Sequence, residues 1–322
     1  MRCLITGATG FVGGHLAARL REAGHEVIGL ARETRPVARR ASLGESVPLH
    51  AIDLRDTAGL STIIQQIQPG WIFHLAGYAN TGKSFREPKA AWDGNLTATQ
   101  SLYEAMTVVG CSARVLYVST GLVYGDSTPD FPFCTENQPL RPASPYAASK
   151  AAADLLSYQA TRHPGLDVVI VRPFNHIGPG QATDYAASNF ARQLAAIEAG
   201  QHLPTILTGG LDSQRDFTDV RDMVRAYVLL MEKGATGEAY NAGSGGTFVM
   251  RDILERLRRM TTASVQVNEQ TDPNRKNDTA ISRVDNGKLT RVTGWQPAID
   301  INQTLVDLLA DWRERIAQTP AR

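Results

Sequence analysis

Apolar residues in the first half of the chain form short runs that alternate with segments of helical periodicity. The runs predicted to be strands are Arg2–Thr6, His25–Leu30, Val47–Ile52, Trp71–Leu75, Arg114–Val118 and Asp167–Arg172. In the last of these, Val168–Val171 is apolar on both faces. Strands of this kind are typical of a parallel sheet that helices cover on both sides. We therefore expect an α/β fold with a doubly wound parallel sheet.

The segments between the strands predict helices that face this sheet. Leu16, Leu20 and Ala23 share one helical face, and Thr57 is predicted to cap a further helix that Pro69-Gly70 ends. Longer helices are expected over Pro88–Val109 and Tyr146–Thr161. The alternation predicts a dinucleotide-binding domain of the Rossmann type in residues 1–172.

The pattern changes after Pro173, where glycine, proline and polar residues cluster in two segments, 175–183 and 208–215. Helices are expected near Ser188–Ala199, Asp222–Lys233, Met250–Met260 and Gln303–Gln318, and a short strand at Glu238–Tyr240. We expect residues 173–322 to form mainly a smaller C-terminal α/β substrate-binding domain, with some segments returning to the main sheet.

Composition narrows the function classes. The 322 residues contain 33 Lys and Arg against 32 Asp and Glu, so the net charge does not favour binding to nucleic acid or to an anionic membrane. Cys3, Cys111 and Cys134 have neither zinc-ligand spacing nor the pattern of a disulfide framework, and no metal is expected. No apolar run reaches the ~18–20 residues that span a bilayer. We expect a cytoplasmic protein that binds neither membranes nor nucleic acid.

A glycine-rich turn follows the first predicted strand and opens the first helix. Glycines in such a turn let the backbone approach a pyrophosphate, and the free N–H groups of the helix then receive its negative charge. The turn predicts these cofactor-binding residues: Gly7, Thr9, Gly10, Phe11, Val12 and Gly13.

The end of the second strand bears on the choice of cofactor. An acidic residue there holds the ribose 2′-hydroxyl of NAD, whereas an arginine accommodates the 2′-phosphate of NADP. Here the strand ends in Ala31-Arg32, which favours NADP(H), although NAD(H) stays possible. Asp53-Leu54 is expected to flank the adenine, and Leu75-Ala76-Gly77 to run beside the phosphates and ribose.

Tyr146 and Lys150 are four residues apart, so a helix places them on one face. The pKa of a phenol is about 10, and a nearby ammonium favours the phenolate and lowers that pKa. Thr120, just past the strand 115–118, offers a hydroxyl to the reacting carbonyl and to the phenol. We predict that Thr120, Tyr146 and Lys150 are catalytic.

These motifs together resemble the extended short-chain dehydrogenase/reductases. The likeness rests on the glycine turn, Leu75-Ala76-Gly77, Ser119-Thr120 before Val123-Tyr124-Gly125, and Tyr146–Lys150. Within that group, Arg172–Gln181 and Arg215–Asp222 are similar to the GDP-6-deoxy-4-keto-D-mannose reductases.

The resemblance implies a reaction: reduction of the C4 keto group of a nucleotide-linked 6-deoxy-4-keto-hexose, with GDP-D-rhamnose as the implied product. Tyr146 would protonate the sugar oxygen, Lys150 would also hold the nicotinamide ribose, and Thr120 would orient the carbonyl. Val118 and Pro173 are assigned to the cofactor site as well.

Sister families share the fold, and local residues separate them. The 4,6-dehydratases that the chain resembles carry a glutamate two residues after the catalytic threonine, where this chain has Leu122 after Gly121, so no proton-transfer group stands there. The 4-epimerases typically show an acid where Ala31 stands. An NAD-dependent nucleotide-sugar 4-epimerase is the first alternative, and a non-catalytic NADP-binding module is the second.

The resemblance also implies substrate-binding residues. These are Ser84, Thr120, Tyr146, Asn175, Arg215 and Arg275, with the two arginines as the expected clamps of a diphosphate. We interpret His176 as structural. Lys276 stands where the family has a proline, so the segment at Arg275 departs from the family pattern. A homodimer is expected through the helices over Pro88–Val109 and Tyr146–Thr161, where the relatives usually pair.

Overall fold

The computed structural model describes residues 1–32, 47–128, 131–270, 281 and 283–318. Its central feature is a seven-stranded sheet in the order β11-β6-β5-β4-β1-β2-β3, in which all neighbouring strands are parallel. The strands are β1 (Arg2–Thr6), β2 (Glu26–Ala31), β3 (Leu49–Ala51), β4 (Trp71–His74), β5 (Arg114–Val118), β6 (Val168–Pro173) and β11 (Ala239–Ala242). The predicted doubly wound parallel sheet is confirmed.

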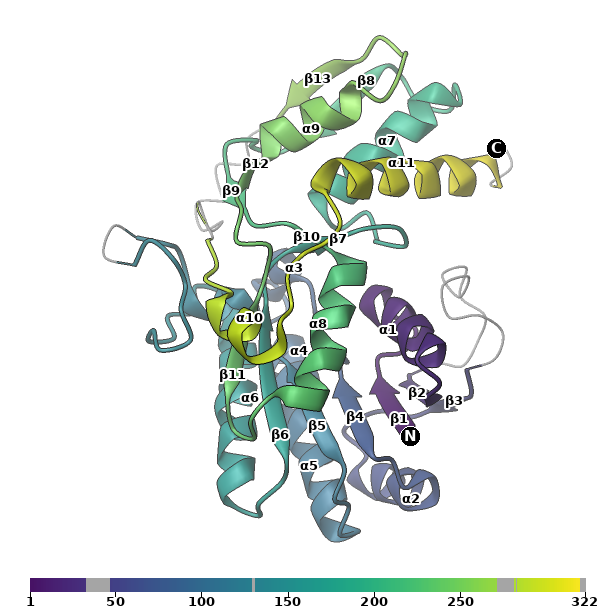
Figure 1. Cartoon of the computed structure of the whole chain (residues 1–322). Coiled ribbons are helices and arrows are strands. Elements are labelled where there is room, and N and C mark those ends of the chain that lie inside the picture. Colours follow the sequence, from purple (N-terminus) through teal and green to yellow (C-terminus); the bar gives the residue numbers. More distant parts are fainter. Residues whose placement is uncertain (33–46, 129–130, 271–280, 282, 319–322) are drawn as a thin grey trace.

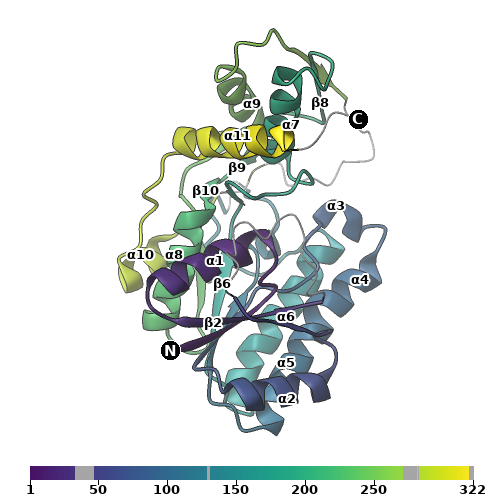
Figure 2. The same ribbon diagram turned by 90° about the vertical axis from the view of Figure 1, so that its right-hand side faces the viewer.

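Helices cover both faces of the sheet, as Figure 2 shows. One face carries α1 (Phe11–Glu22), α8 (Val220–Lys233) and α10 (Gly287–Thr293); the other carries α2 (Thr57–Ile67), α5 (Ala98–Val108) and α6 (Pro145–Arg162). Successive residues of a strand point to opposite faces. In β5, Leu116 packs in the core of the first face, and Val115 and Tyr117 pack in the core of the second.

Two helices differ in detail from the sequence prediction. Asp56, and not Thr57, caps α2, because its carboxylate accepts a hydrogen bond from the backbone N–H of Gly59 (3.0 Å). The helix expected over Pro88–Val109 consists of α4 (Pro88–Trp92), a π-helical turn (Asp93–Thr97) and α5. Turns of this kind occur frequently at functional sites.

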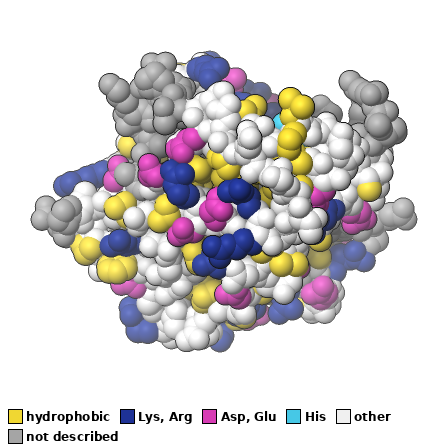
Figure 3. Space-filling view, turned by 90° about the horizontal axis from the view of Figure 1, so that it is seen from above, with side chains coloured by type: hydrophobic (Ala, Val, Ile, Leu, Met, Phe, Trp, Pro, Cys, Tyr) yellow, Lys and Arg dark blue, Asp and Glu magenta, His cyan; other side chains and the backbone are white. Residues whose placement is uncertain are grey.

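The second half builds a smaller part with a core of its own, drawn at the top of Figure 1. It contains α7 (Ala186–Glu198), α9 (Met250–Arg258), α11 (Ile301–Ala317) and the strand pairs β7 (His176–Ile177) with β10 (Thr218–Asp219), β8 (Thr205–Thr208) with β13 (Gln266–Glu269), and β9 (Gln214–Arg215) with β12 (Phe248–Val249). Seen from above, basic and acidic side chains lie interspersed on this part (Figure 3), in keeping with a net charge of +1.

The chain crosses between the two parts more than once, since β11, α8 and α10 lie in the main sheet layers although they follow residue 173. The division at residue 172 therefore stays a prediction about domains. Among the described residues, no helix has the length and apolar character needed to cross a membrane.

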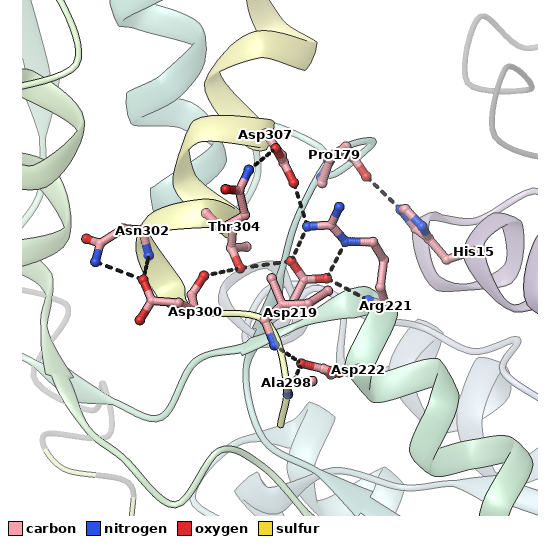
Figure 4. Close-up of polar contacts among 12 residues, drawn as sticks. His15, Pro179, Asp219, Arg221, Asp222, Ala298, Asp300, Asn302, Thr304 and Asp307 are labelled. Atoms are coloured by element: carbon pink, nitrogen blue, oxygen red, sulfur yellow. Dashed lines mark hydrogen bonds and ion pairs between the residues drawn. The ribbon is translucent and has the colours of Figure 1, made fainter. Parts of the chain in front are cut away.

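A polar cluster joins the start of α8 to α11 (Figure 4). The guanidinium of Arg221 binds Asp219 and Asp307, at 2.7 Å each. The hydroxyl of Thr304 donates a hydrogen bond to Asp219 (2.8 Å), and Asp219 also caps α8 by accepting from the Arg221 N–H. The smaller part is thus fixed to the helix that lies on the sheet.

Candidate active site

A cavity of about 1160 Å³ opens at the carboxyl ends of the sheet strands and continues into the smaller part. This is the edge where ligands bind in open α/β sheets. The predicted residues that line it are Gly7, Thr9, Gly10, Phe11, Val12, Gly13, Ala31, Arg32, Asp53, Leu54, Leu75, Ala76, Gly77, Val118, Thr120, Tyr146, Lys150, Pro173, Asn175 and Arg215.

The glycine turn has the tight backbone that a pyrophosphate site needs. Gly7 has a positive φ of 72°, and a Cβ on Gly13 would lie 2.4 Å from the carbonyl oxygen of Gly7. No side chain caps the N-terminus of α1, so its first N–H groups face the cavity without competition from a capping side chain. An uncapped helix N-terminus favours a bound anion. The residues present therefore fit a dinucleotide phosphate.

One end of the cavity is lined by Arg32, expected to bind a 2′-phosphate, and by Asp53, expected to flank adenine. Arg55 also lines it and binds both oxygens of Asp53 (2.6–3.2 Å). This hydrogen-bonded ion pair lowers the pKa of Asp53 to about 2. Arg55 was not predicted from the sequence, although its position two residues after Asp53 was a usable signal.

Tyr146 and Lys150 lie in the first turns of α6, which Ser144 caps by accepting a hydrogen bond from the Ala147 N–H (3.1 Å). Lys150 Nζ donates to the carbonyl oxygen of Val118 and lies 4.7 Å from the centroid of the Tyr117 ring. Burial lowers the pKa of Lys150 to about 7, and the carboxylate of Asp154 opposes this shift. The side chain is almost fully buried, with 6% of its surface exposed.

The phenol of Tyr146 differs from the expectation of a lowered pKa. Burial raises its pKa to about 12, the nearby phenol of Tyr185 adds to this, and a hydrogen bond with Thr120 opposes it. Burial disfavours the phenolate more than the surrounding groups favour it. A phenol in this state is protonated at neutral pH, which is the form that donates a proton.

Several buried polar atoms near this group have no hydrogen-bond partner among the described residues. They include the hydroxyl oxygens of Ser119 and Tyr227, which both line the cavity, and Oδ1 of Asn95. The amide nitrogen of Asn95 donates to Ser149 Oγ (2.9 Å), one residue before Lys150. Buried polar groups are nearly always satisfied, so the hydroxyl groups of Ser119 and Tyr227 are consistent with a ligand in the cavity.

Asn95 and Tyr227 were not predicted from the sequence. Asn95 comes from the π-helical turn and Tyr227 from the middle of α8. Neither belongs to a motif whose spacing in the sequence points to the site, and only the packing of α8 against the sheet brings Tyr227 to the cavity.

Among the predicted substrate residues, Asn175 donates a hydrogen bond from its amide to the carbonyl oxygen of Asp216 (3.3 Å). The buried carboxylate of Asp216 accepts hydrogen bonds from Ser244 and Gly245 (2.8–2.9 Å). Burial still raises the pKa of Asp216 to about 6. These contacts hold the loop next to Arg215, which lines the cavity from β9.

Two predicted substrate residues are not at the cavity wall that the structure describes. Ser84 is buried, and its hydroxyl donates to the carbonyl oxygen of Thr81 (2.6 Å). It is not among the described residues that line the cavity, so the structure adds no support to its predicted role. Arg275 and the neighbouring Lys276 lie outside the described residues.

His176 links the glycine turn to the segment that carries Asn175. Its ring lies parallel to that of Phe11, with the centroids 6.1 Å apart, and its Nδ1 is 3.0 Å from the carbonyl oxygen of Phe174. His15 of α1 makes a similar link, with Nε2 at 2.8 Å from the carbonyl oxygen of Pro179 (Figure 4). Burial lowers the pKa of both histidines, which suits packing roles for neutral rings.

Gly121 and Leu122 follow Thr120 at the wall of the cavity. A Cβ on Gly121 would lie 2.7 Å from the ring of Phe174, so the glycine permits close packing there. Neither side chain carries a group that could transfer a proton.

The chain is similar to known proteins over nearly its whole length. The family model described as GDP-mannose 4,6 dehydratase matches residues 4–308. GDP-6-deoxy-D-mannose reductase of Pseudomonas aeruginosa is 34% identical, with 98% of this chain and 99% of the relative covered. UDP-glucose 4-epimerase of Mycolicibacterium smegmatis is 30% identical, with 98% and 99% covered.

Solved structures give the same picture. The structure of RMD from Pseudomonas aeruginosa complexed with NADPH has a TM-score of 0.86 and 32% identity, with 98% of this chain and 99% of that chain covered. UDP-glucose 4-epimerase of Thermus thermophilus, in complex with NAD, has a TM-score of 0.87 and 27% identity, with 97% and 99% covered. The resemblance inferred from the motifs is confirmed, and the chain belongs to the GDP-mannose 4,6 dehydratase family of enzymes.

Proposed function

We propose that the protein is an NADP(H)-dependent oxidoreductase that reduces the C4 keto group of GDP-4-keto-6-deoxy-D-mannose to give GDP-D-rhamnose. The observation that carries the proposal is a single cavity lined by the glycine turn, by Arg32 and by Thr120, Tyr146 and Lys150. The 34% identity to a GDP-6-deoxy-D-mannose reductase supports the choice of substrate.

The residues at the sheet edge fit the cofactor. The N–H groups of the glycine turn would hold the pyrophosphate, Arg32 the 2′-phosphate, and Lys150 the nicotinamide ribose. When bound, NADPH supplies the hydride that reduces the sugar carbon. The solved structure of a relative with NADPH supports this choice over NAD(H).

Tyr146 is the proposed proton donor to the C4 oxygen, which becomes the hydroxyl of the product. Its raised pKa keeps the phenol protonated at neutral pH, so the donor is in the required form. The ammonium of Lys150, held at the Val118 carbonyl, stabilises the phenolate that remains. The hydroxyl of Thr120 orients the carbonyl for this transfer.

The GDP end of the substrate would extend into the smaller part. Asn175 and Arg215 line that portion of the cavity, and a guanidinium matches a diphosphate in a bidentate manner. Arg275 stays a predicted second clamp.

The test is a direct assay with purified protein, NADPH and GDP-4-keto-6-deoxymannose, followed by the loss of nicotinamide absorbance. We expect oxidation of one NADPH for each GDP-6-deoxyhexose formed. An absence of NADPH loss across pH and substrate concentration would refute the proposal.

A nucleotide-sugar 4-epimerase is the second candidate, favoured by the 30% identity to the Mycolicibacterium smegmatis epimerase. It predicts tightly retained NAD and interconversion of sugars without net reduction. Denaturing the purified protein and identifying the released nucleotide separates the two functions. Against this candidate, Ala31 offers no carboxylate to the ribose 2′-hydroxyl.

A non-catalytic NADP-binding module is the remaining alternative, and the variant Tyr146→Phe tests it.

We further infer a homodimer that forms through α4, α5 and α6. Trp92 of α4 and Leu155 of α6 expose apolar side chains, with 39% and 61% of their surface accessible. Two exposed apolar groups on adjoining helices support an interface there. Light scattering measures the mass of the particle in solution: a monomer at micromolar concentration would contradict this inference.

The cytoplasmic location stays a prediction.

A further inference from the structure

Two segments from different halves of the chain meet at the wall of the cavity. Asn80 Nδ2 and Lys83 Nζ both donate to Asp184 Oδ1, at 3.2 Å each. One residue further, the hydroxyl of Tyr185 donates to the carbonyl oxygen of Ala79 (3.5 Å). In Figure 2, α3 (Thr81–Ser84), which carries Lys83, lies on the side of the sheet layers that faces the smaller part.

Local structure explains why these groups are in reach. Asn80 caps α3 through its side-chain oxygen, which accepts from the Lys83 N–H (2.8 Å), and this leaves the amide nitrogen to bind Asp184. Tyr185 is the last extended residue before α7 and caps that helix without a side-chain hydrogen bond. Fixing Asp184 therefore fixes the point at which α7 begins and the direction of the Tyr185 side chain.

Tyr185 lies on the same cavity as the proposed proton donor. Both Tyr185 and Tyr146 line it, and the two phenols are close enough that Tyr185 raises the pKa of Tyr146. Arg32 and the glycine turn line the cofactor end of the cavity. The part of a nucleotide sugar that must reach Tyr146 is the hexose, because the keto carbon belongs to it.

We propose that Tyr185 binds the hexose of the substrate and that Asp184, held by Asn80 and Lys83, is a positioning residue for it. This inference rests on the proposed reductase function and names a residue that binds the sugar within the same site. A phenol can donate to and accept from sugar hydroxyls, and aromatic side chains with a few placed polar groups are typical of ligand sites. Asn80 and Lys83 both bind the same oxygen of Asp184, so the two contacts together hold the segment that carries Tyr185.

The first test compares GDP-mannose with GDP by calorimetry, because GDP lacks the hexose. Each variant is compared with the wild type for the same ligand, so the extra charge on the terminal phosphate of GDP does not enter the comparison. Tyr185→Phe is expected to weaken GDP-mannose binding about 3- to 10-fold, the worth of one neutral hydrogen bond, and to leave GDP binding unchanged. With the keto-sugar, KM rises by a similar factor, while KM for NADPH stays constant. Tyr158→Phe is the matched control, since Tyr158 does not line the cavity and its hydroxyl is bound by Arg162.

The second test concerns Asp184 as a positioning residue. Asp184→Ala and Lys83→Met should each weaken GDP-mannose binding but not GDP binding, and the double variant should lose less than the two single losses together. Tyr185→Phe should have a smaller effect in the Asp184→Ala background than in the wild type. Glu238→Ala is the control, because it removes an ion pair (Lys288–Glu238, 2.6 Å) that is not at the cavity.

The outcomes separate two failures. If the wild type reduces the keto-sugar and binds GDP-mannose, but Tyr185→Phe matches it in both, the inference is wrong and the proposed function stands. Equal losses for GDP and GDP-mannose would also overturn it, since they would show a general disturbance of the site. If the wild type neither binds nor reduces nucleotide sugars, the proposed function fails and the inference fails with it.

Discussion

The ammonium of Lys150 donates a hydrogen bond to the carbonyl oxygen of Val118, the last residue of β5. The same nitrogen lies over the ring of Tyr117. These contacts hold a positive charge at the carboxyl end of the sheet, four residues after Tyr146 on α6. They do not offset the burial of that charge, which lowers the pKa of Lys150 to about 7. The buried charge of Lys150 therefore lowers the stability of the fold, while the proposed catalysis requires that charge.

We predict that Lys150→Met makes the fold more stable at pH 6.5, by about 1–3 kcal/mol, while it abolishes reduction. The folded-state pKa of about 7 lies below the unfolded value of a lysine. Between those two values the unfolded chain binds more protons, so the wild-type free energy of unfolding rises with pH. The advantage of the variant should accordingly shrink from pH 7 towards pH 10.

Urea unfolding of both proteins at pH 6.5 and pH 9 measures this difference. Lys89→Met is the control, because the side chain of Lys89 is 86% exposed and its removal should change stability little. A Lys150→Met variant that is less stable than the wild type at pH 6.5 would show that the hydrogen bond and the ring contact outweigh burial.

Tyr146→Phe should reduce turnover about 10²- to 10⁴-fold, since it removes the proposed general acid. NADPH affinity should stay within a few-fold, which distinguishes loss of chemistry from loss of the cofactor. Because the pKa of Tyr146 is raised to about 12, the wild-type phenol stays protonated up to about pH 10, and a fall in activity below that pH must come from another group. Turnover that survives in the variant would assign the proton to a different donor.

Arg32→Ala should raise KM for NADPH about 10- to 100-fold and leave KM for NADH nearly unchanged, because only NADPH carries the 2′-phosphate. Arg55→Ala is a useful comparison at the same end of the cavity, since the guanidinium of Arg55 is already paired with Asp53. We expect it to affect both cofactors alike and more weakly. Equal losses for NADH and NADPH in Arg32→Ala would contradict a 2′-phosphate site.

Features encoded in short stretches of sequence were predictable. The strands, the glycine turn and the i,i+4 pair of Tyr146 and Lys150 each depend on residues within a few positions of one another, and the structure brings them to one cavity. The cap of α2 was missed because Asp56 and Thr57 are both good capping residues and adjacent.

Other features depend on packing between distant segments. Asp184 contacts Lys83 although the two residues are 101 positions apart in the sequence, and no local sequence pattern predicts that contact. Tyr227 reaches the cavity only because α8 lies on the sheet. The pKa of Tyr146 was expected to fall because the charge of Lys150 could be placed from the sequence, whereas the depth of burial that raises the pKa could not.

The ion pairs between α8 and α11 give a last prediction (Figure 4). We expect the loss of stability from removing a charged group to be larger where the remaining partner is buried. Arg221 binds Asp219, whose side chain is fully buried, and Asp307, whose side chain is 25% exposed. Arg221→Met leaves the carboxylate of Asp219 buried without its cationic partner, so we expect a loss of about 2–4 kcal/mol in the free energy of unfolding.

Asp307→Asn should cost less than about 1 kcal/mol, because Arg221 keeps its contact with Asp219 and water reaches the altered group. Urea unfolding at neutral pH compares the two variants, and equal losses of stability would mean that α11 is held mainly by the Asp307 contact.

Arg221→Met should also raise KM for the nucleotide sugar more than KM for NADPH. The reason is that β10, which ends at Asp219, pairs with β7 just after Asn175, a proposed substrate residue, while the glycine turn lies between β1 and α1.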